Sequence, residues 1–146
     1  MSEWDDASLA LDDQLCFALY AASRAVTARY RPLLAELGLT YPQYLVMLAL
    51  WEHGSASVKD LGAMLALDYG TLSPLLKRLE STGLVHRERS VSDERTVLVT
   101  LTPAGRALRR KAVRVPARIG SATGLSPAEA RRLREDLHAI TAQLAD

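Results

Sequence analysis

The sequence is poor in the residues that build disulfide frameworks, metal sites and membrane spans. Its 146 residues include one cysteine, one phenylalanine and three histidines. A single cysteine excludes an internal disulfide, and the histidines are scattered without the spacing of metal ligands. No apolar run approaches the roughly 20 residues that a membrane helix requires. We therefore expect a globular protein that needs no metal, cofactor or membrane to fold.

Length and composition fit one ordinary domain. Hydrophobic residues make up 49% of the chain and charged residues 24%, with no internal repeat. This is enough apolar material for a real core at 146 residues. The start of the chain is acidic, with Glu3, Asp5 and Asp6, and shows no secretory signal. We expect a cytoplasmic location, where the cysteine rests as a thiol.

The charge of the chain is unevenly distributed. The net charge is only +1, yet residues 77–118 contain eleven Lys or Arg and four Asp or Glu. Such a concentrated basic segment attracts phosphate groups. The near-neutral total therefore conceals a candidate nucleic-acid surface.

Residues 57–83 have the pattern of two short helices. Ser57 is a candidate N-cap for the first, and either Asp68 or Thr71 for the second. Pro74 is tolerated only near the first turn of a helix, so the second helix must begin close to Gly70. The alternating residues of 84–91 and 96–101 predict two strands joined by a charged turn.

A helix pair followed by a basic hairpin is typical of DNA-reading domains, in which the second helix enters the major groove. The alternative is a small α+β domain with a solvated hairpin, which the concentrated positive charge disfavours. We expect Arg95 at the hairpin tip to enter the minor groove and Asp93 to orient the tip. The predicted DNA-binding residues are Asp68, Tyr69, Thr71, Ser73, Pro74, Lys77, Arg78, Arg87, Asp93 and Arg95.

The hairpin carries a specific motif. Asp93 and Arg95 form D-x-R, and the following strand ends in Leu101 and Thr102. In this respect the sequence resembles the MarR family of winged helix-turn-helix regulators. The resemblance implies a mainly α fold with a small β wing (α+β), in the order α-α-α-α-β-β-α-α. A single MarR-type domain would span 1–146, with sensor and dimerisation helices at 8–53, the winged unit at 54–102 and dimerisation helices at 103–146.

The segments outside the winged unit are predicted to be helical. Residues 8–37 have the spacing of one long helix, and Thr40 with Gln43 forms a capping box for the next. Residues 54–57 are a candidate third strand beside the wing. Helices are expected after Pro103 and after Ser126. Their apolar surface exceeds what the winged unit can cover, so we expect a homodimer that reads a pseudo-palindromic operator in double-stranded DNA.

The first helix contains the only distinctive chemistry, at Cys16. Tyr20 lies one turn further on, and Tyr30 returns to nearly the same face. Fourteen residues correspond to about 21 Å of helix, so Tyr30 cannot touch Cys16 of its own chain. If two copies cross antiparallel about a dyad near Ser23, Tyr30 of one chain arrives beside Cys16 of the other.

The segments L-C-F-A-L-Y at 15–20 and L-G-L-T-Y-P-Q-Y at 37–44 resemble the organic-hydroperoxide-sensing, OhrR-type branch of that family. The resemblance implies that Cys16 is the redox sensor. It also implies hydrogen bonds to Cys16 from Tyr30 and Tyr41 of the partner subunit, with Tyr20 nearby. Some members carry a second cysteine, which is absent here. The oxidised form would then need an external low-molecular-weight thiol, or further oxidation.

The sequence around Cys16 does not by itself stabilise a thiolate. A helix spanning 8–37 places Cys16 too deep for its N-terminal dipole to help, and Asp12 and Asp13 oppose a thiolate. Activation is then expected from phenol hydroxyls at the dimer seam.

Two other functions remain open. In one, a MarR-type repressor binds a phenolic or other small molecule and Cys16 is only packed. A response to oxidant that persists in Cys16→Ser favours this reading. In the other, the protein is a thiol peroxidase. The lack of a second cysteine and of a cation near Cys16 argues against it, and we expect no enzymatic activity.

Overall fold

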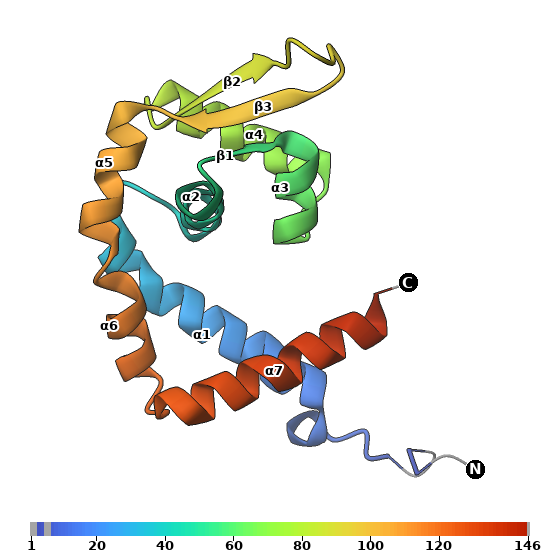
Figure 1. The fold of residues 1–146 in the computed structure, drawn as a ribbon. Coiled ribbons are helices and arrows are strands. Elements are labelled where there is room, and N and C mark those ends of the chain that lie inside the picture. The colour runs from blue at the N-terminus through green and yellow to red at the C-terminus, as the bar shows by residue number, and fades with distance from the viewer. Residues whose placement is uncertain (1–2, 5–6, 146) are drawn as a thin grey trace.

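The computed structural model describes residues 3–4 and 7–145, so Asp5 and Asp6 of the acidic start lie outside the described residues. The elements are mostly helical, with one small sheet (Figure 1). In chain order they are η1 (Leu11–Asp13), α1 (Leu15–Ala35), α2 (Tyr41–His53), β1 (Ser55–Ser57), α3 (Val58–Leu65), α4 (Tyr69–Ser81), β2 (Val85–Arg89), β3 (Val97–Leu101), α5 (Pro103–Ala112), α6 (Val115–Ala122) and α7 (Pro127–Leu144).

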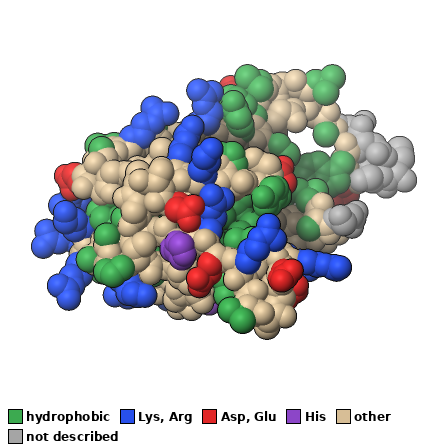
Figure 2. Space-filling view, turned by 90° about the horizontal axis from the view of Figure 1, so that it is seen from above, with side chains coloured by type: hydrophobic (Ala, Val, Ile, Leu, Met, Phe, Trp, Pro, Cys, Tyr) green, Lys and Arg blue, Asp and Glu red, His purple; other side chains and the backbone are tan. Residues whose placement is uncertain are grey.

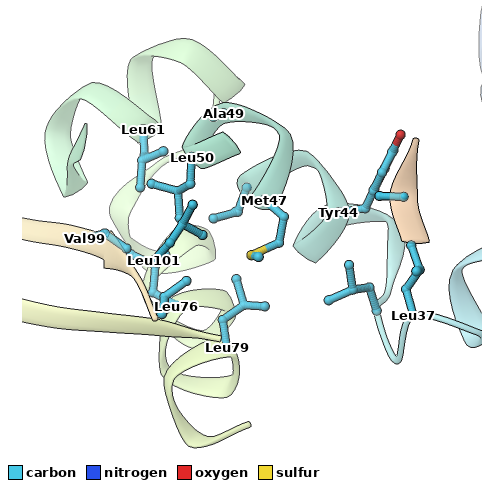
Figure 3. Close-up of a cluster of buried hydrophobic side chains, with 14 of the residues drawn as sticks. Leu37, Tyr44, Met47, Ala49, Leu50, Leu61, Leu76, Leu79, Val99 and Leu101 are labelled. Atoms are coloured by element: carbon cyan, nitrogen blue, oxygen red, sulfur yellow. The ribbon is translucent and has the colours of Figure 1, made fainter. Parts of the chain in front are cut away.

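Helix α2 lies at the centre of the core. The predicted capping box is confirmed at its start, where Gln43 N–H donates to Thr40 Oγ1 and Thr40 N–H donates to Gln43 Oε1. Met47 and Leu50 are fully buried, and Figure 3 shows them between the other helices and the sheet. A helix that is apolar on most sides has to be surrounded, which is why the other elements pack around α2.

The winged unit comprises α3, α4 and a three-stranded antiparallel sheet in the order β1-β3-β2. The predicted third strand is confirmed, with Ser55 opposite Thr100 and Ser57 opposite Leu98. Ser57 also caps α3 by accepting from Asp60 N–H. Leu61 of α3 is fully buried in the core, whereas Met64 is 45% exposed.

Helix α4 begins at Tyr69, next to the predicted start near Gly70. Asp68 is the N-cap, and its Oδ1 accepts from Thr71 N–H at 2.7 Å. Hydrogen bonds from Thr71 lower the pKa of the Asp68 carboxyl. Pro74 therefore lies in the second turn, and Leu72, Leu76 and Leu79 form the buried face.

Hydrogen bonds at the base of the wing join it to α2 and α5. Trp51 of α2 donates its indole N–H to Gly105 O at 2.9 Å. Thr102 caps α5 by accepting from Gly105 N–H, and its hydroxyl donates to Gly83 O at 2.6 Å. A Cβ on Gly105 would collide with the backbone carbonyl of Leu84. Only glycine fits this crossing.

The terminal helices depart from the prediction at both ends. The predicted start at residue 8 is wrong, because Gln14 is extended and α1 begins at Leu15. The Gln14 amide donates to Ser8 O and Ala10 O, which holds the preceding segment as a separate turn. The chain after the wing forms α5 and α6 rather than one helix, with Pro116 in the first turn of α6. The order therefore has one helix more than predicted.

Helices α1 and α7 leave apolar side chains uncovered. Leu34 is the only fully buried residue of α1, and among the described residues α7 has none. Leu15, Phe17, Tyr20, Val26, Leu133 and Leu144 are exposed. Figure 1 shows both helices below the winged unit, on the side of α2 away from the sheet. Within residues 3–4 and 7–145, no helix has the length and apolarity needed to cross a membrane.

The Gly105 crossing generates a stability prediction. We expect Gly105→Ala to lower the free energy of unfolding by about 3 kcal/mol, because backbone rather than a movable side chain blocks the new methyl group. Gly70→Ala is the matched control, since its Cβ meets only ordinary contact, and we expect a change below about 1 kcal/mol. Urea denaturation measures both, and equal stability of the two variants would contradict the packing described.

Candidate functional site

The winged unit presents one continuous surface between α4 and the hairpin. Tyr69, Thr71, Pro74, Lys77 and Arg78 are exposed on α4, and Ser73 is half-buried. A groove of about 1160 Å³ runs between α3, α4 and the strands and is lined by Lys59, Tyr69, Ser73 and Arg95 among others. Four of the predicted DNA-binding residues, Tyr69, Ser73, Arg87 and Arg95, thus line one groove.

Asp93 organises the turn between β2 and β3. Its carboxylate accepts from Arg95 N–H at 3.0 Å and from the Thr96 hydroxyl at 3.1 Å. Arg89 also donates to Glu94 O across the turn. With its backbone fixed in this way, Arg95 projects an exposed guanidinium that makes no ion pair with the described residues.

Arg87 is held differently from the other predicted cations. Its guanidinium pairs with Glu80 Oε1 at 3.2 Å, and its backbone N–H donates to Glu80 Oε2 at 2.8 Å. The backbone bond, followed by the guanidinium, lowers the pKa of the Glu80 carboxyl. Arg87 therefore anchors strand β2 to helix α4, whereas the other predicted cations, Lys77, Arg78 and Arg95, are in no ion pair of the described residues.

Positive charge dominates the view from above the wing. Figure 2 shows Lys and Arg spread over this face and outnumbering Asp and Glu. The basic segment found in the sequence thus reaches the surface rather than being neutralised inside. This surface can bind a polyanion, because it combines an exposed helix, a wing of fixed geometry and cations that are not in ion pairs.

Cys16 occupies the second position of α1 and is exposed. The prediction that it lies too deep for the helix dipole is wrong, since the helix starts one residue before it. First-turn N–H groups and the positive end of the helix favour an anion nearby. Leu15 and Phe17 give the thiol an exposed apolar rim.

The tyrosines fall into two groups. Tyr30, Tyr41 and Tyr44 form one cluster, with ring centroids of Tyr30 and Tyr41 4.6 Å apart. Burial, with a smaller effect of Tyr41 and Tyr44, raises the pKa of Tyr30 to about 12, and burial raises the pKa values of Tyr41 and Tyr44 as well. These phenols stay protonated donors at neutral pH. Tyr20 is exposed near the Cys16 end, with Arg24 stacked 5.5 Å from its ring centroid.

Three residues with structural roles at these sites were missed by the sequence analysis. Tyr44 is buried beneath Tyr30 and Tyr41, and its ring meets Trp51, which reaches the wing junction. Glu80 fixes Arg87. Tyr44 was within the quoted segment 37–44, so its position one turn after Thr40 was the available signal.

The fold, with a helix pair, a charged wing and uncovered terminal helices, defines a winged helix-turn-helix protein. A family model described as transcriptional regulator SarA/Rot matches residues 28–111. The chain belongs to this MarR-type family of winged-helix transcriptional regulators.

Individual relatives match most of the chain. The organic hydroperoxide resistance transcriptional regulator of Bacillus subtilis is 48% identical over 89% of this chain and 88% of its own. The regulator TtmR of Methylorubrum extorquens is 51% identical, over 92% of this chain and 69% of its own. The structure of reduced AbfR, a Staphylococcus epidermidis protein, bound to DNA has 38% identity and a TM-score of 0.78, covering 93% of this chain and 95% of that one.

Proposed function

We propose that this protein is a transcriptional repressor that releases its operator DNA when an organic hydroperoxide oxidises Cys16. The observation that carries the proposal is the placement of the only cysteine, exposed in the first turn of α1 and rimmed by apolar side chains. The name of the Bacillus relative, and AbfR structures described as reduced and overoxidised on DNA, support it. We infer that the protein acts in the cytoplasm, where such operators are found.

DNA binding is assigned to the winged surface. Helix α4 enters the major groove, with Thr71, Ser73 and Lys77 near base edges and Arg78 near phosphates. Arg95 enters the adjacent minor groove, where a narrow A·T-rich segment concentrates negative potential. Asp68 and Pro74 shape the helix, Tyr69 offers an exposed ring at its start, and Arg87 holds the wing.

The uncovered faces of α1 and α7 form the homodimer interface in this proposal. Their exposed leucines and aromatic residues are too many for a monomer to leave in water. Two recognition helices related by a dyad would read a pseudo-palindromic operator.

Sensing begins at the thiolate. Cys16 sulfur attacks the outer oxygen of the hydroperoxide, the O–O bond breaks, and the alcohol leaves with the remaining oxygen and a proton. The sulfenic acid then condenses with a low-molecular-weight thiol, which forms a mixed disulfide and releases water. A second hydroperoxide instead takes the sulfur to sulfinic acid.

Release follows from crowding at the dimer seam. Tyr30 of the partner subunit and Tyr41 of the partner subunit face the sulfur in this arrangement, and oxidation replaces a small thiol with bulk and polarity. The two phenols stack on each other and on Tyr44, so they shift together with α2. A shift of α2 moves one winged unit against the other and spoils the half-site spacing.

The wing assignment is tested by Arg95→Ala. We expect operator affinity to fall roughly tenfold to hundredfold and the salt dependence to weaken by about one ion, because one minor-groove cation is lost. Fluorescence anisotropy over a range of salt concentrations measures both. Arg131→Ala on α7 removes an equal charge from an exposed site and should change neither. Unchanged affinity in Arg95→Ala contradicts the assignment.

The sensing assignment is tested by Cys16→Ser. This variant should bind the operator as wild type does, yet stay bound when an organic hydroperoxide is added, whereas wild type loses about 100-fold in affinity. Met64→Leu removes another exposed, oxidisable sulfur and should respond like wild type. Release of Cys16→Ser by hydroperoxide at the wild-type dose would exclude Cys16 as the sensor.

The phenol donors are tested by Tyr30→Phe, which keeps the ring and removes the hydroxyl. We expect oxidation of Cys16 to slow roughly tenfold, because one hydrogen bond to the developing thiolate is lost. Mass spectrometry of the thiol during exposure to hydroperoxide follows the rate. Tyr69→Phe, on α4, is the control. A wild-type rate in Tyr30→Phe would remove Tyr30 from the sensing site.

A further inference from the structure

A basic cleft lies where the end of α1 meets α5 and α6. It encloses about 300 Å³ and contains Arg110, Lys111, Arg114 and Arg118 over an apolar floor that includes Leu33. Glu36 is the only acidic residue in its lining. A second hollow shares Leu33 and Arg118 with it and adds Arg29. We refer to the first hollow as the basic cleft.

The cations of the cleft have no partners within the described part of the chain. None of the ion pairs within 4.0 Å among the described residues includes Arg110, Lys111, Arg114 or Arg118. Four positive charges in a small hollow repel one another and raise the local potential. An anionic group that enters the cleft reduces this repulsion and so stabilises the fold.

The cleft does not belong to the DNA-reading surface. In Figure 1 the wing and α6 lie at opposite ends of α5, and the cleft is at the α6 end, beside the end of α1. Leu33, which lines it, is three residues after Tyr30 and lies on the same side of α1, and Leu37 follows just beyond the end of that helix. In the dimer proposed above, the cleft therefore lies next to the part of α1 that faces Cys16 of the partner subunit.

Unpaired acids occur at the matching position of the sequence. Asp12 and Asp13 lie in η1, both exposed and outside every ion pair of residues 3–4 and 7–145. In an antiparallel crossing about Ser23, Cys16 is seven residues before the dyad and Tyr30 seven residues after it. Asp13 is ten before and Leu33 ten after. Asp13 lies in η1, two residues before the first residue of α1, so the register that puts Tyr30 beside Cys16 also brings η1 towards Leu33 and the cleft.

We propose that the basic cleft of each subunit binds Asp12 and Asp13 of the partner subunit. The proposal rests on the proposed function, since the sensing arrangement sets the register. Ion pairs here fix η1, the turn that precedes α1 and ends three residues before Cys16. They also neutralise the two carboxylates that would otherwise disfavour a negative sulfur. The cleft is thus a dimer contact that prepares the sensor.

The test is a pair of charge-swapped proteins. The first carries Arg114→Glu and Arg118→Glu, and the second carries Asp12→Arg and Asp13→Arg. In each homodimer, the cleft of one subunit and residues 12 and 13 of the other then carry net charge of the same sign, at both contacts. A heterodimer of the two has opposite charges at both contacts, because one keeps the native pairing and the other has it reversed. One protein is labelled with ¹⁵N, and native mass spectrometry counts the three dimers after mixing.

We expect more than about nine-tenths heterodimer at low salt, against the one half expected by chance, and a decline towards one half as salt screens the charges. The control pair replaces the cleft variant with Arg131→Glu and Arg132→Glu on α7, and its preference for the heterodimer should be smaller. A chance distribution for the cleft pair overturns the proposal. So does a preference equal to that of the control pair.

The outcome separates this contact from the sensing function. If the heterodimer is preferred while Cys16→Ser still responds to hydroperoxide, the contact stands and the sensor assignment fails. If the preference is absent and Cys16→Ser is unresponsive, Cys16 is the sensor and the cleft has another occupant. Loss of operator affinity in the cleft variant without any heterodimer preference would assign the cleft to DNA.

Discussion

The burial of α2 is the constraint on which the other parts of the molecule depend. Met47 and Leu50 draw the winged unit onto one side of this helix, while Tyr44 supports the phenols on the other. Trp51 then ties the same helix to the junction of the wing. One rigid element therefore carries both the reading surface and half of the proposed sensor, and neither can shift without moving the other.

The start of α1 contains both the cysteine and part of the exposed apolar surface proposed for the dimer interface. Gln14 interrupts the chain, so Cys16 sits in a first turn rather than in the middle of a longer helix. The preceding turn keeps Asp12 and Asp13 at the surface, and the apolar rim keeps the thiol beside surface that only another subunit can cover. In the proposed sensor, the environment of Cys16 is therefore completed by the partner subunit.

Signals confined to a few neighbouring residues were predictable from the sequence. Capping boxes at Thr40 and Ser126 and the third strand at 55–57 were found because each depends on local spacing. The start of α1 was missed because the apolar residues before Gln14 keep the helical period, although they face away from the core. Spacing cannot tell burial within one chain from burial between two.

Contacts between distant segments were also beyond the sequence. The sequence grouped Arg87 with the DNA-binding cations, but in the structure the Glu80–Arg87 ion pair joins a helix to a strand and occupies this guanidinium. Likewise, the basic cleft joins residues about 80 positions apart, and charge counting found the basic segment without its geometry. Periodicity orders residues along one element and says nothing about which elements meet.

The sheet order has a consequence for how such regulators diversify. Because β3 lies between β1 and β2, the wing is bonded to the strand that follows α2, and Thr102 locks its base to the end of α4. The unit from β1 to β3 is thus bonded within itself, and it meets α2 through buried side chains such as Met47 and Leu50. Sequence change on its outer face can retarget the protein to new promoters while the chemistry of the terminal helices is inherited intact, so one oxidant can come to govern unrelated genes.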